Sequence, residues 1–136
     1  MLKTEVARGP GGRVLLLDSV TKIAPEDAGA IVVTGSHGGA SAGEFSLAVP
    51  LKLVVFNDAG VGKDRAGIVA LEMLRRKGVA AAAVSHDSAR IGDAADMWAN
   101  GVVSHVNALA ATLGLAPGRS LRRAITRLVV GPDPNS

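Results

Sequence analysis

Five short runs of apolar residues, each about the length of one β-strand, recur along the chain and limit what it can fold into. They lie at residues 14–20, 30–34, 51–56, 79–84 and 102–105. Segments with helical patterning separate them, and such alternation indicates βαβ units. The near-continuous run 51–56 is typical of a parallel strand buried on both faces. The sequence therefore predicts an α/β fold with a mainly parallel open sheet of about five strands and helices on both faces, a Rossmann- or flavodoxin-like architecture.

Length and local signals predict the organisation along the chain. A chain of 136 residues has the size of one domain. We expect a flexible lead-in at residues 1–13, a single α/β domain at 14–130 and a disordered tail at 131–136. Ser41 followed by Glu44 fits a capping box for a short helix that ends near residue 48. Five polar residues are expected to be helix N-caps: Ser41, Asp64 (for a helix running to Lys77), Asp93, Asn107 and Ser120.

The composition excludes several kinds of site. The chain has no cysteine, which rules out disulfides, zinc ribbons, iron–sulfur clusters and cysteine nucleophiles. Its first residues lack the apolar stretch of a signal peptide, and no apolar run approaches the ~20 residues of a membrane helix. We therefore expect a cytoplasmic protein with no membrane partner. The apolar content of 48% leads us to expect a homo-oligomer.

The net charge of +3 comes from the C-terminal segment, because Lys/Arg and Asp/Glu balance over residues 1–118. Arg119, Arg123 and Arg127 are spaced four residues apart on a predicted helix and could contact nucleic-acid phosphates. Aromatic residues make up only 2% of the chain, which leaves little for stacking on bases. A solvated helix face is the favoured interpretation, and nucleic-acid binding is kept as a weaker alternative.

All three histidines follow a serine at the expected end of a strand: Ser36-His37, Ser85-His86 and Ser104-His105. The run 51–56 ends instead in Asn57-Asp58. In an open α/β sheet, ligands bind outside the carboxyl ends of the strands. The sequence therefore predicts a site at this edge of the sheet.

The first candidate for this site is the glycine-rich segment 35–41 between a strand and a helix. Its backbone N–H groups and the helix N-terminus could bind a phosphate, a carboxylate or an oxyanion. The spacing G-x-G-x-x-G of dinucleotide-binding turns is absent. The alternative is a tight turn that needs glycine for steric reasons. The candidates here are His37 for catalysis, and Gly35, Ser36, Gly38, Gly39 and Ser41 for ligand binding.

The second candidate is the segment 57–67. Gly60-Val61-Gly62-Lys63 resembles part of a P-loop, but the first glycine is missing and Asp64 stands where Ser or Thr must hold magnesium. Asn57 is a candidate ligand-binding residue and Asp58 a candidate catalytic acid or base. Lys63 could clamp an anion, act as a base or form a Schiff base. The alternative is a turn residue at Asp58 and a solvated lysine.

The third and fourth candidates follow the last two runs. His86 and His105 are candidate catalytic residues, and Arg90 could bind a carboxylate through two parallel hydrogen bonds. Ser85 and Ser88 are candidate ligand-binding residues in the same loop as His86. Ser88 is equally suited to a turn, and His105 to a structural role.

Metal and serine-nucleophile chemistry are less well supported. Three histidines can hold a catalytic zinc, but no H-x-H or H-x₃-H spacing occurs, so no cofactor is predicted and a divalent metal is left open. A Ser-His-Asp triad is also left open, although the chain lacks the G-x-S-x-G motif that often carries the serine. Adjacent Ser and His in a strand should point to opposite faces, so a triad would need residues from different loops.

Together these features predict a small enzyme that uses acid/base chemistry on a small anionic metabolite, as a lyase, isomerase or hydrolase. The glycine-rich turn and Lys63 would hold the anion. Asp58 or His86 would move a proton, and His37 or His105 would stabilise developing charge. The alternative is a non-catalytic ligand-binding or regulatory subunit of a larger enzyme.

Overall fold

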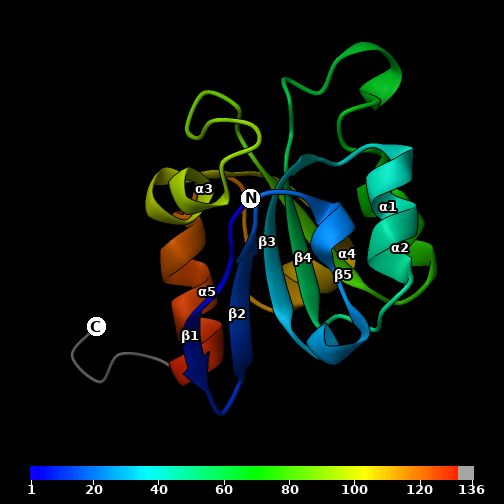
Figure 1. Cartoon of the computed structure of the whole chain (residues 1–136). Helices are drawn as coiled ribbons and strands as arrows, with labels where there is room; N and C mark the ends of the chain where they lie inside the picture. The colour runs from blue at the N-terminus through cyan, green and yellow to red at the C-terminus, as the bar shows by residue number, and fades with distance from the viewer. Residues whose placement is uncertain (132–136) are drawn as a thin grey trace.

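The computed structural model describes residues 1–131 and contains a six-stranded sheet with helices against both faces (Figure 1). The strands are β1 (Lys3–Gly9), β2 (Gly12–Leu17), β3 (Ile31–His37), β4 (Leu53–Asn57), β5 (Ala80–Val84) and β6 (Val103–Val106). They lie in the sheet in the order in which they occur in the chain. The predicted mixed α/β class is therefore confirmed.

The sheet is mixed, which corrects the expectation of a mainly parallel sheet of about five strands. The central strands β2 to β5 are parallel, whereas β1 and β6 each pair antiparallel at an edge. Residues Lys3–Gly9, expected to belong to a flexible lead-in, form β1 because the Pro10-Gly11 turn folds them back on β2 as a hairpin. Their mostly exposed side chains give no apolar signal in the sequence.

The Rossmann- or flavodoxin-like detail is not confirmed. Doubly wound sheets reverse their strand order at a switch point, which creates the ligand crevice. Here the order runs from β1 to β6 without reversal. The connections from β2 through β5 consequently lie over one face of the sheet, as right-handed crossovers require.

The helices form one layer on each face. The helices α1 (Ala40–Leu47) and α2 (Val69–Arg76) cover one face, and α3 (Ala94–Asn100) and α5 (Leu121–Val130) cover the other (Figure 1). The helix α4 (Ala108–Thr112) follows β6, and the short 3-10 turns are η1 (Val20–Lys22), η2 (Pro25–Asp27) and η3 (Lys63–Arg65).

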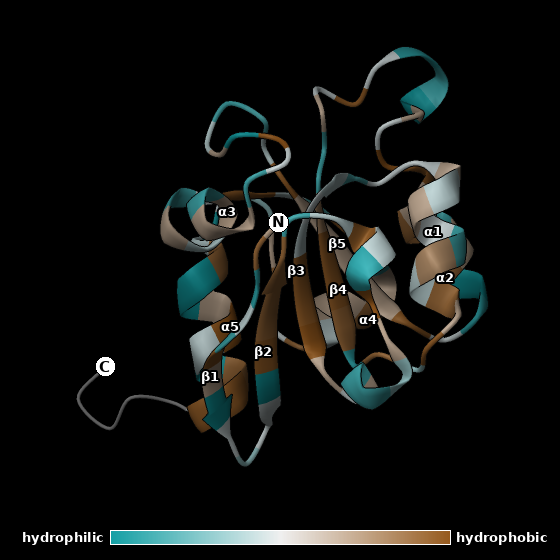
Figure 2. Cartoon of the chain, in the orientation of Figure 1, coloured by the Kyte–Doolittle hydropathy of each residue, from teal (hydrophilic) through white to brown (hydrophobic). Residues whose placement is uncertain are grey.

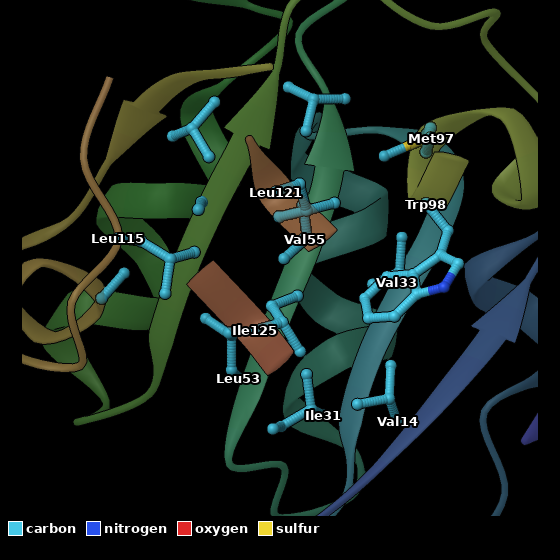
Figure 3. Close-up of a cluster of buried hydrophobic side chains, with 14 of the residues drawn as sticks. Val14, Ile31, Val33, Leu53, Val55, Met97, Trp98, Leu115, Leu121 and Ile125 are labelled. Atoms are coloured by element: carbon cyan, nitrogen blue, oxygen red, sulfur yellow. The ribbon is translucent and has the colours of Figure 1, made fainter. Parts of the chain in front are cut away.

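Strand residues alternate between the two layers. Val33 and Val55 pack with Met97 of α3 and Leu121 of α5, as Figure 3 shows. The intervening residues, Phe56 among them, pack under α1 and α2 instead. In Figure 2 the central strands are strongly hydrophobic and most of the hydrophilic residues lie on helices and loops. Two buried faces explain why the strands read as continuous apolar runs.

Three of the five predicted N-caps are confirmed. The side chains of Asp93, Asn107 and Ser120 accept the backbone N–H three residues ahead in α3, α4 and α5. Ser41 is not a cap, because α1 begins at Ala40 after Gly39. Asp64 is not a cap either, because it lies within η3 with a left-handed φ of 55° and α2 begins only at Val69.

None of the helices in residues 1–131 has the length and apolar content that crossing a membrane requires. The predicted tail at 131–136 falls outside the described residues, apart from Gly131.

Candidate functional site

Two long loops leave the sheet at the edge where the parallel strands end. Residues 58–68 follow β4 and residues 85–93 follow β5, and both extend above the sheet in Figure 1. The Asp58 N–H donates to the carbonyl of Val84 (2.8 Å), and the Asn57 amide donates to the carbonyl of Ala89 (3.0 Å). The two loops are thus joined at their bases.

Asp58 is the centre of the polar cluster between these loops. It is 5% exposed, and its Oδ1 accepts the backbone N–H groups of Gly60 (2.8 Å) and His86 (3.1 Å). The ring Nδ1 of His86 lies 3.3 Å from the same oxygen. The ring Nδ1 of His105 lies 4.0 Å from Asp58 Oδ2. One buried carboxylate therefore faces two imidazoles from different elements.

The surroundings of Asp58 keep its carboxyl ionised. Burial is the largest single influence on its pKa and acts to raise it. Hydrogen bonds from the Gly60 amide, the Ser104 hydroxyl, and the His86 amide and ring together outweigh burial and hold the pKa of Asp58 below its ordinary value of 3.8. At neutral pH this side chain is an acceptor and cannot donate a proton.

His86 lies between two carboxylates. Its ring lies over Gly60, where a Cβ would come within 3.4 Å of the ring Cε1. Glycine is favoured at Gly60 by its left-handed φ of 75°, whereas the contact with the ring is an ordinary van der Waals one. While Nδ1 faces Asp58, Nε2 lies 3.4 Å from Oδ1 of Asp87, a side chain that is 86% exposed.

A β-bulge in β6 brings Ser104 and His105 to the same side of the strand. Ala83 pairs with His105 and Val84 with Val103, so Ser104 is the additional, unpaired residue. Its Oγ lies 3.0 Å from His105 Nδ1. The expectation that adjacent Ser and His point to opposite faces is therefore wrong at this pair, because the bulge interrupts the alternation on which it rested.

The arrangement nevertheless differs from a Ser-His-Asp triad. In a triad the carboxylate faces one ring nitrogen and the serine the other. Here both Asp58 and Ser104 approach the same nitrogen, His105 Nδ1. The Ser104 hydroxyl also donates to the carbonyl of Ala83 (3.3 Å). Among the described residues, no group of three or more His, Cys, Asp or Glu side chains could hold a metal ion.

The polar residues of the loop 85–93 mostly bond within the protein. Ser85 Oγ accepts the Asp87 N–H (3.1 Å). Ser88 Oγ donates to the Ser85 carbonyl (2.8 Å) and accepts the Val102 N–H (2.9 Å). Arg90 is exposed, and its backbone N–H donates to Asp96. Asn57 is fully buried, with its oxygen accepting the Ala59 N–H in addition to the amide bond to Ala89.

The glycine-rich turn packs closely against neighbouring loops. A Cβ at Gly35 would lie 2.6 Å from the Gly92 carbonyl carbon, and one at Gly38 would lie 2.9 Å from the Gly67 oxygen. A Cβ at Gly39 would lie 2.8 Å from Nε2 of His37, whose ring covers it. The backbone contacts give Gly35 and Gly38 a steric reason to be glycine, whereas at Gly39 the neighbour is a side chain that can turn aside. Ser36 Oγ accepts the Val20 N–H (3.0 Å), and Ser41 is exposed in the first turn of α1.

His37 and Lys63 take no part in the described contacts that join Asp58, His86 and His105. His37 ends β3 beside Asn57 and is exposed, and none of the described hydrogen bonds or ion pairs joins it to Asp58. Lys63 is exposed in η3, on a loop in which Ala59, Val61, Asp64 and Arg65 all have left-handed φ. Non-glycine residues in this region carry strain of order 1 kcal/mol or more each.

Two surface hollows lie elsewhere, on the α1–α2 side of the sheet. One is lined by Leu47, Val49, Pro50, Lys77 and Val79, and the other by Leu47, Val69, Glu72, Met73, Arg76 and Lys77. They carry no histidine and no buried carboxylate, so we give more weight to the Asp58 cluster.

The C-terminal arginines lie on α5 and in the turn before it. Arg119, Arg122, Arg123 and Arg127 are exposed, and the Arg122 guanidinium lies 5.7 Å from the centre of the Trp98 ring. This contact attaches one of the four charges to the protein surface.

Comparisons with protein-family models, with curated proteins and with solved structures find no match to this chain. Its function is therefore inferred from the geometry of the Asp58 cluster.

Two residues of this cluster, Ser104 and Asp87, lie in candidate segments of the sequence but were given no role of their own there. Both are neighbours of a candidate histidine, which is the signal that could have found them. The contact of Ser104 depends on a bulge, and that of Asp87 on the conformation of a loop. Neither feature has a sequence pattern that would predict it.

Proposed function

We propose that the chain is a small enzyme that carries out acid/base chemistry on a small anionic molecule at the carboxyl edge of the sheet. The observation that carries this proposal is the buried Asp58 carboxylate, which faces His86 with one oxygen and His105 with the other. An ionised carboxylate in this position can orient both rings and stabilise the charge of either ring when it takes a proton. Histidine is the side chain that most often transfers protons in enzymes.

The position of the cluster supports the proposal as well. The sheet has no switch point to form a crevice, but the site lies between the two long loops that follow β4 and β5, and loops held by a rigid sheet are where binding and catalytic residues concentrate. The loop 58–68 carries two exposed cations, Lys63 and Arg65, and the loop 85–93 carries one, Arg90. These cations are the support for an anionic ligand, since Arg and Lys recognise carboxylates and phosphates.

The first experiment is a thermal-shift screen of the purified protein against small carboxylates and phosphates. A ligand at 100 times its Kd adds about 2.7 kcal/mol, which is a shift of roughly 8–10 °C for a domain of this size. The protein and each ligand that shifts it are then followed by NMR for turnover. We expect at least one ligand to be converted, and conversion to be lost in His86→Ala and His105→Ala.

Arg75→Ala provides a control on binding and turnover, since Arg75 pairs with Glu72 on α2, away from the cluster. A ligand that binds and reacts equally well in both histidine variants would place the activity elsewhere.

The alternative is a ligand-binding or regulatory subunit. The openness of the site favours it, because His86 is 51% exposed and the two surface hollows lie on another side of the sheet. A partner chain could enclose a ligand here. This alternative predicts a ligand whose binding requires Asp58 but which the isolated protein leaves chemically unchanged.

A further inference from the structure

Both histidines of the cluster turn Nδ1 toward Asp58, but Nε2 of His86 faces a further carboxylate, Asp87, and this difference narrows the reaction class. His105 Nδ1 lies next to Ser104 Oγ and Asp58. When the Ser104 hydroxyl gives its single proton to the Ala83 carbonyl (3.3 Å), its oxygen faces His105 Nδ1 (3.0 Å) as an acceptor, and the ionised Asp58 on the same side favours a proton on that nitrogen. The Ser104 oxygen can therefore accept a hydrogen bond from His105 Nδ1–H. In that tautomer Nε2 has a lone pair and can act as a base.

His86 has a different environment. Its Nδ1 faces the buried Asp58 and its Nε2 faces Asp87 at 3.4 Å. Because Asp87 is 86% exposed, a ligand oxygen can displace it at little cost. The Asp87 oxygen thus marks where an oxyanion of a substrate could accept a hydrogen bond from His86.

Ser104 is a poor candidate for a nucleophile. An attacking serine needs a base that faces its hydroxyl and is itself oriented through its other ring nitrogen. His105 reaches both Ser104 and Asp58 through Nδ1. Ser104 is also partly buried within β6 and bonded to the neighbouring strand. The cluster has proton carriers without an activated nucleophile.

We propose that this site moves a proton between carbon and oxygen of a small carbonyl compound, with His105 Nε2 as the base and His86 as the proton donor to the carbonyl oxygen. This inference rests on the proposed acid/base function and narrows it to isomerase or lyase chemistry, without hydrolysis through a serine ester.

The step is balanced within the site. His105 Nε2 takes the proton from the carbon next to the carbonyl, and the C–H electron pair forms the C=C bond of an enol. The carbonyl π pair takes the proton from the His86 N–H. Return of a proton to the same carbon gives exchange with solvent, return to the neighbouring carbon gives an isomer, and loss of a leaving group gives elimination. Asp58 and Ser104 act as positioning residues.

The test uses exchange of carbon-bound hydrogen in D₂O, because it needs no knowledge of the natural substrate. Pyruvate, 2-oxobutyrate and dihydroxyacetone phosphate are incubated with the protein, and loss of the C–H signal next to the carbonyl is followed by proton NMR. We expect exchange at least ten-fold faster than in buffer for one of them. General-base catalysis contributes about 10²–10⁴-fold to a rate. His105→Ala should therefore lower the exchange rate at least 100-fold, or down to the rate in buffer if the wild type accelerates exchange by less than that.

Ser104 provides the sharper discrimination. Nitrogen NMR of labelled histidine should show His105 as the Nδ1–H tautomer in the wild type. That preference should be lost in Ser104→Ala and restored in Ser104→Thr, and exchange should weaken and recover in parallel. A fluorophosphonate, which labels activated serines, should leave Ser104 unmodified. Labelling of Ser104, detected by mass spectrometry, would overturn the inference in favour of a serine nucleophile.

Failure of the inference is distinguishable from failure of the proposed function. If none of the three carbonyl compounds exchanges while a ligand from the thermal-shift screen is converted in an Asp58-dependent way, the carbon-acid reaction is wrong and the acid/base function stands. If no ligand is converted and none exchanges, both are wrong.

Discussion

Asp58 has two roles that a single substitution can separate. Its Oδ1 accepts two backbone N–H groups that shape the loops after β4 and β5, and its charge faces the two histidines. Asp58→Asn retains an oxygen for the backbone bonds and removes the charge. Asp58→Ala removes both.

We predict that Asp58→Asn changes the free energy of unfolding at pH 7 by less than about 1.5 kcal/mol, whereas Asp58→Ala lowers it by about 2–4 kcal/mol. Both variants should lose at least 100-fold in the rate of ligand conversion. Urea denaturation and NMR turnover measure the two effects. Full turnover in Asp58→Asn would show that the carboxylate only shapes the loop.

Asn107 is a second buried polar residue, and its role is structural. Its amide nitrogen donates to the carbonyls of Leu71 (3.1 Å) and Val79 (3.0 Å). Its oxygen accepts the N–H groups of Ala81 (3.1 Å) and Ala110 (3.0 Å). One side chain thus connects α2, β5 and α4. In an aspartate at this position, an oxygen would replace the amide nitrogen and would face the carbonyl oxygens of Leu71 and Val79, which offer no hydrogen to accept.

We predict that Asn107→Asp lowers the free energy of unfolding by about 3 kcal/mol or more at pH 7, because two donors are lost and a charge is buried. Protonation of the new carboxyl restores one donor, so the loss should be smaller at pH 5. Asn100→Asp is the control at an exposed position. It gives up the amide bond to Asp96 (2.8 Å) and places two carboxylates side by side in water, so it should cost about 1 kcal/mol, well below the loss at Asn107. Equal effects of the two substitutions in urea denaturation would contradict this role.

At the scale of elements, the glycine-rich turn and the loop 85–93 are fitted to each other. The Gly92 N–H donates to the Gly35 carbonyl (2.8 Å), and a Cβ at Gly35 would lie within 2.6–2.8 Å of three backbone atoms. Backbone cannot move aside as a flexible side chain can. Gly35 is therefore required because the backbone of the loop 85–93 leaves no room for a Cβ at this position.

We predict that Gly35→Ala lowers the free energy of unfolding by about 3 kcal/mol, at the upper end of overpacking effects. It should also displace the loop that carries His86 and weaken ligand binding. Gly43→Ala is the matched control, because its new Cβ would meet mainly the flexible end of Met73 and alanine favours the helix. It should change stability by less than about 1 kcal/mol in urea denaturation. A Gly35→Ala protein as stable as Gly43→Ala would refute the close fit.

The elements that could be predicted are those whose signal is local. Each of the five apolar runs overlaps a strand, and the caps at Asp93, Asn107 and Ser120 follow from side chains that bond within one helical turn. The strand β1 was missed because its exposed residues show no burial pattern. Asp64 failed as a cap because the left-handed residues around it delay the helix to Val69.

The candidate site was predicted in outline and not in detail. Convergence of Asp58 with all three histidines was expected from their positions at strand ends. The structure brings His86 and His105 to Asp58, and none of the described hydrogen bonds or ion pairs joins His37 to it. The antiparallel direction of β6 and its bulge were not foreseen, because pairing direction is decided by contacts between distant segments. The role of Ser104 depends on both.

At the scale of the whole molecule, ionised carboxylates hold the segments around the sheet together. The pKa of Asp18 is lowered by the backbone N–H of Leu2 and then that of Ala94, which tie β2 to the N-terminal segment and to α3. The pKa of Asp96 is lowered by Asn100 and then by the Arg90 N–H. Asp58 is the third aspartate whose pKa is lowered by backbone N–H groups, one of them from another segment, besides its side-chain partners. All three bind their partners most strongly when charged.

The final prediction concerns stability at acid pH. Because the pKa of each of these carboxyls is lower in the folded chain than its ordinary value of 3.8, the unfolded chain binds protons first as the pH falls. The stability they contribute is complete above about pH 5 and is lost as the pH falls below 4 through their folded pKa values. Urea midpoints between pH 2.5 and 7 should therefore drop steeply below pH 4. The drop should be shallower in Asp18→Asn and in Asp58→Asn, whose amides do not titrate. It should be unchanged in Asp87→Asn, since that carboxylate is exposed. An equally steep drop in all four proteins would mean that other groups govern acid unfolding and that these carboxylates add little to the fold.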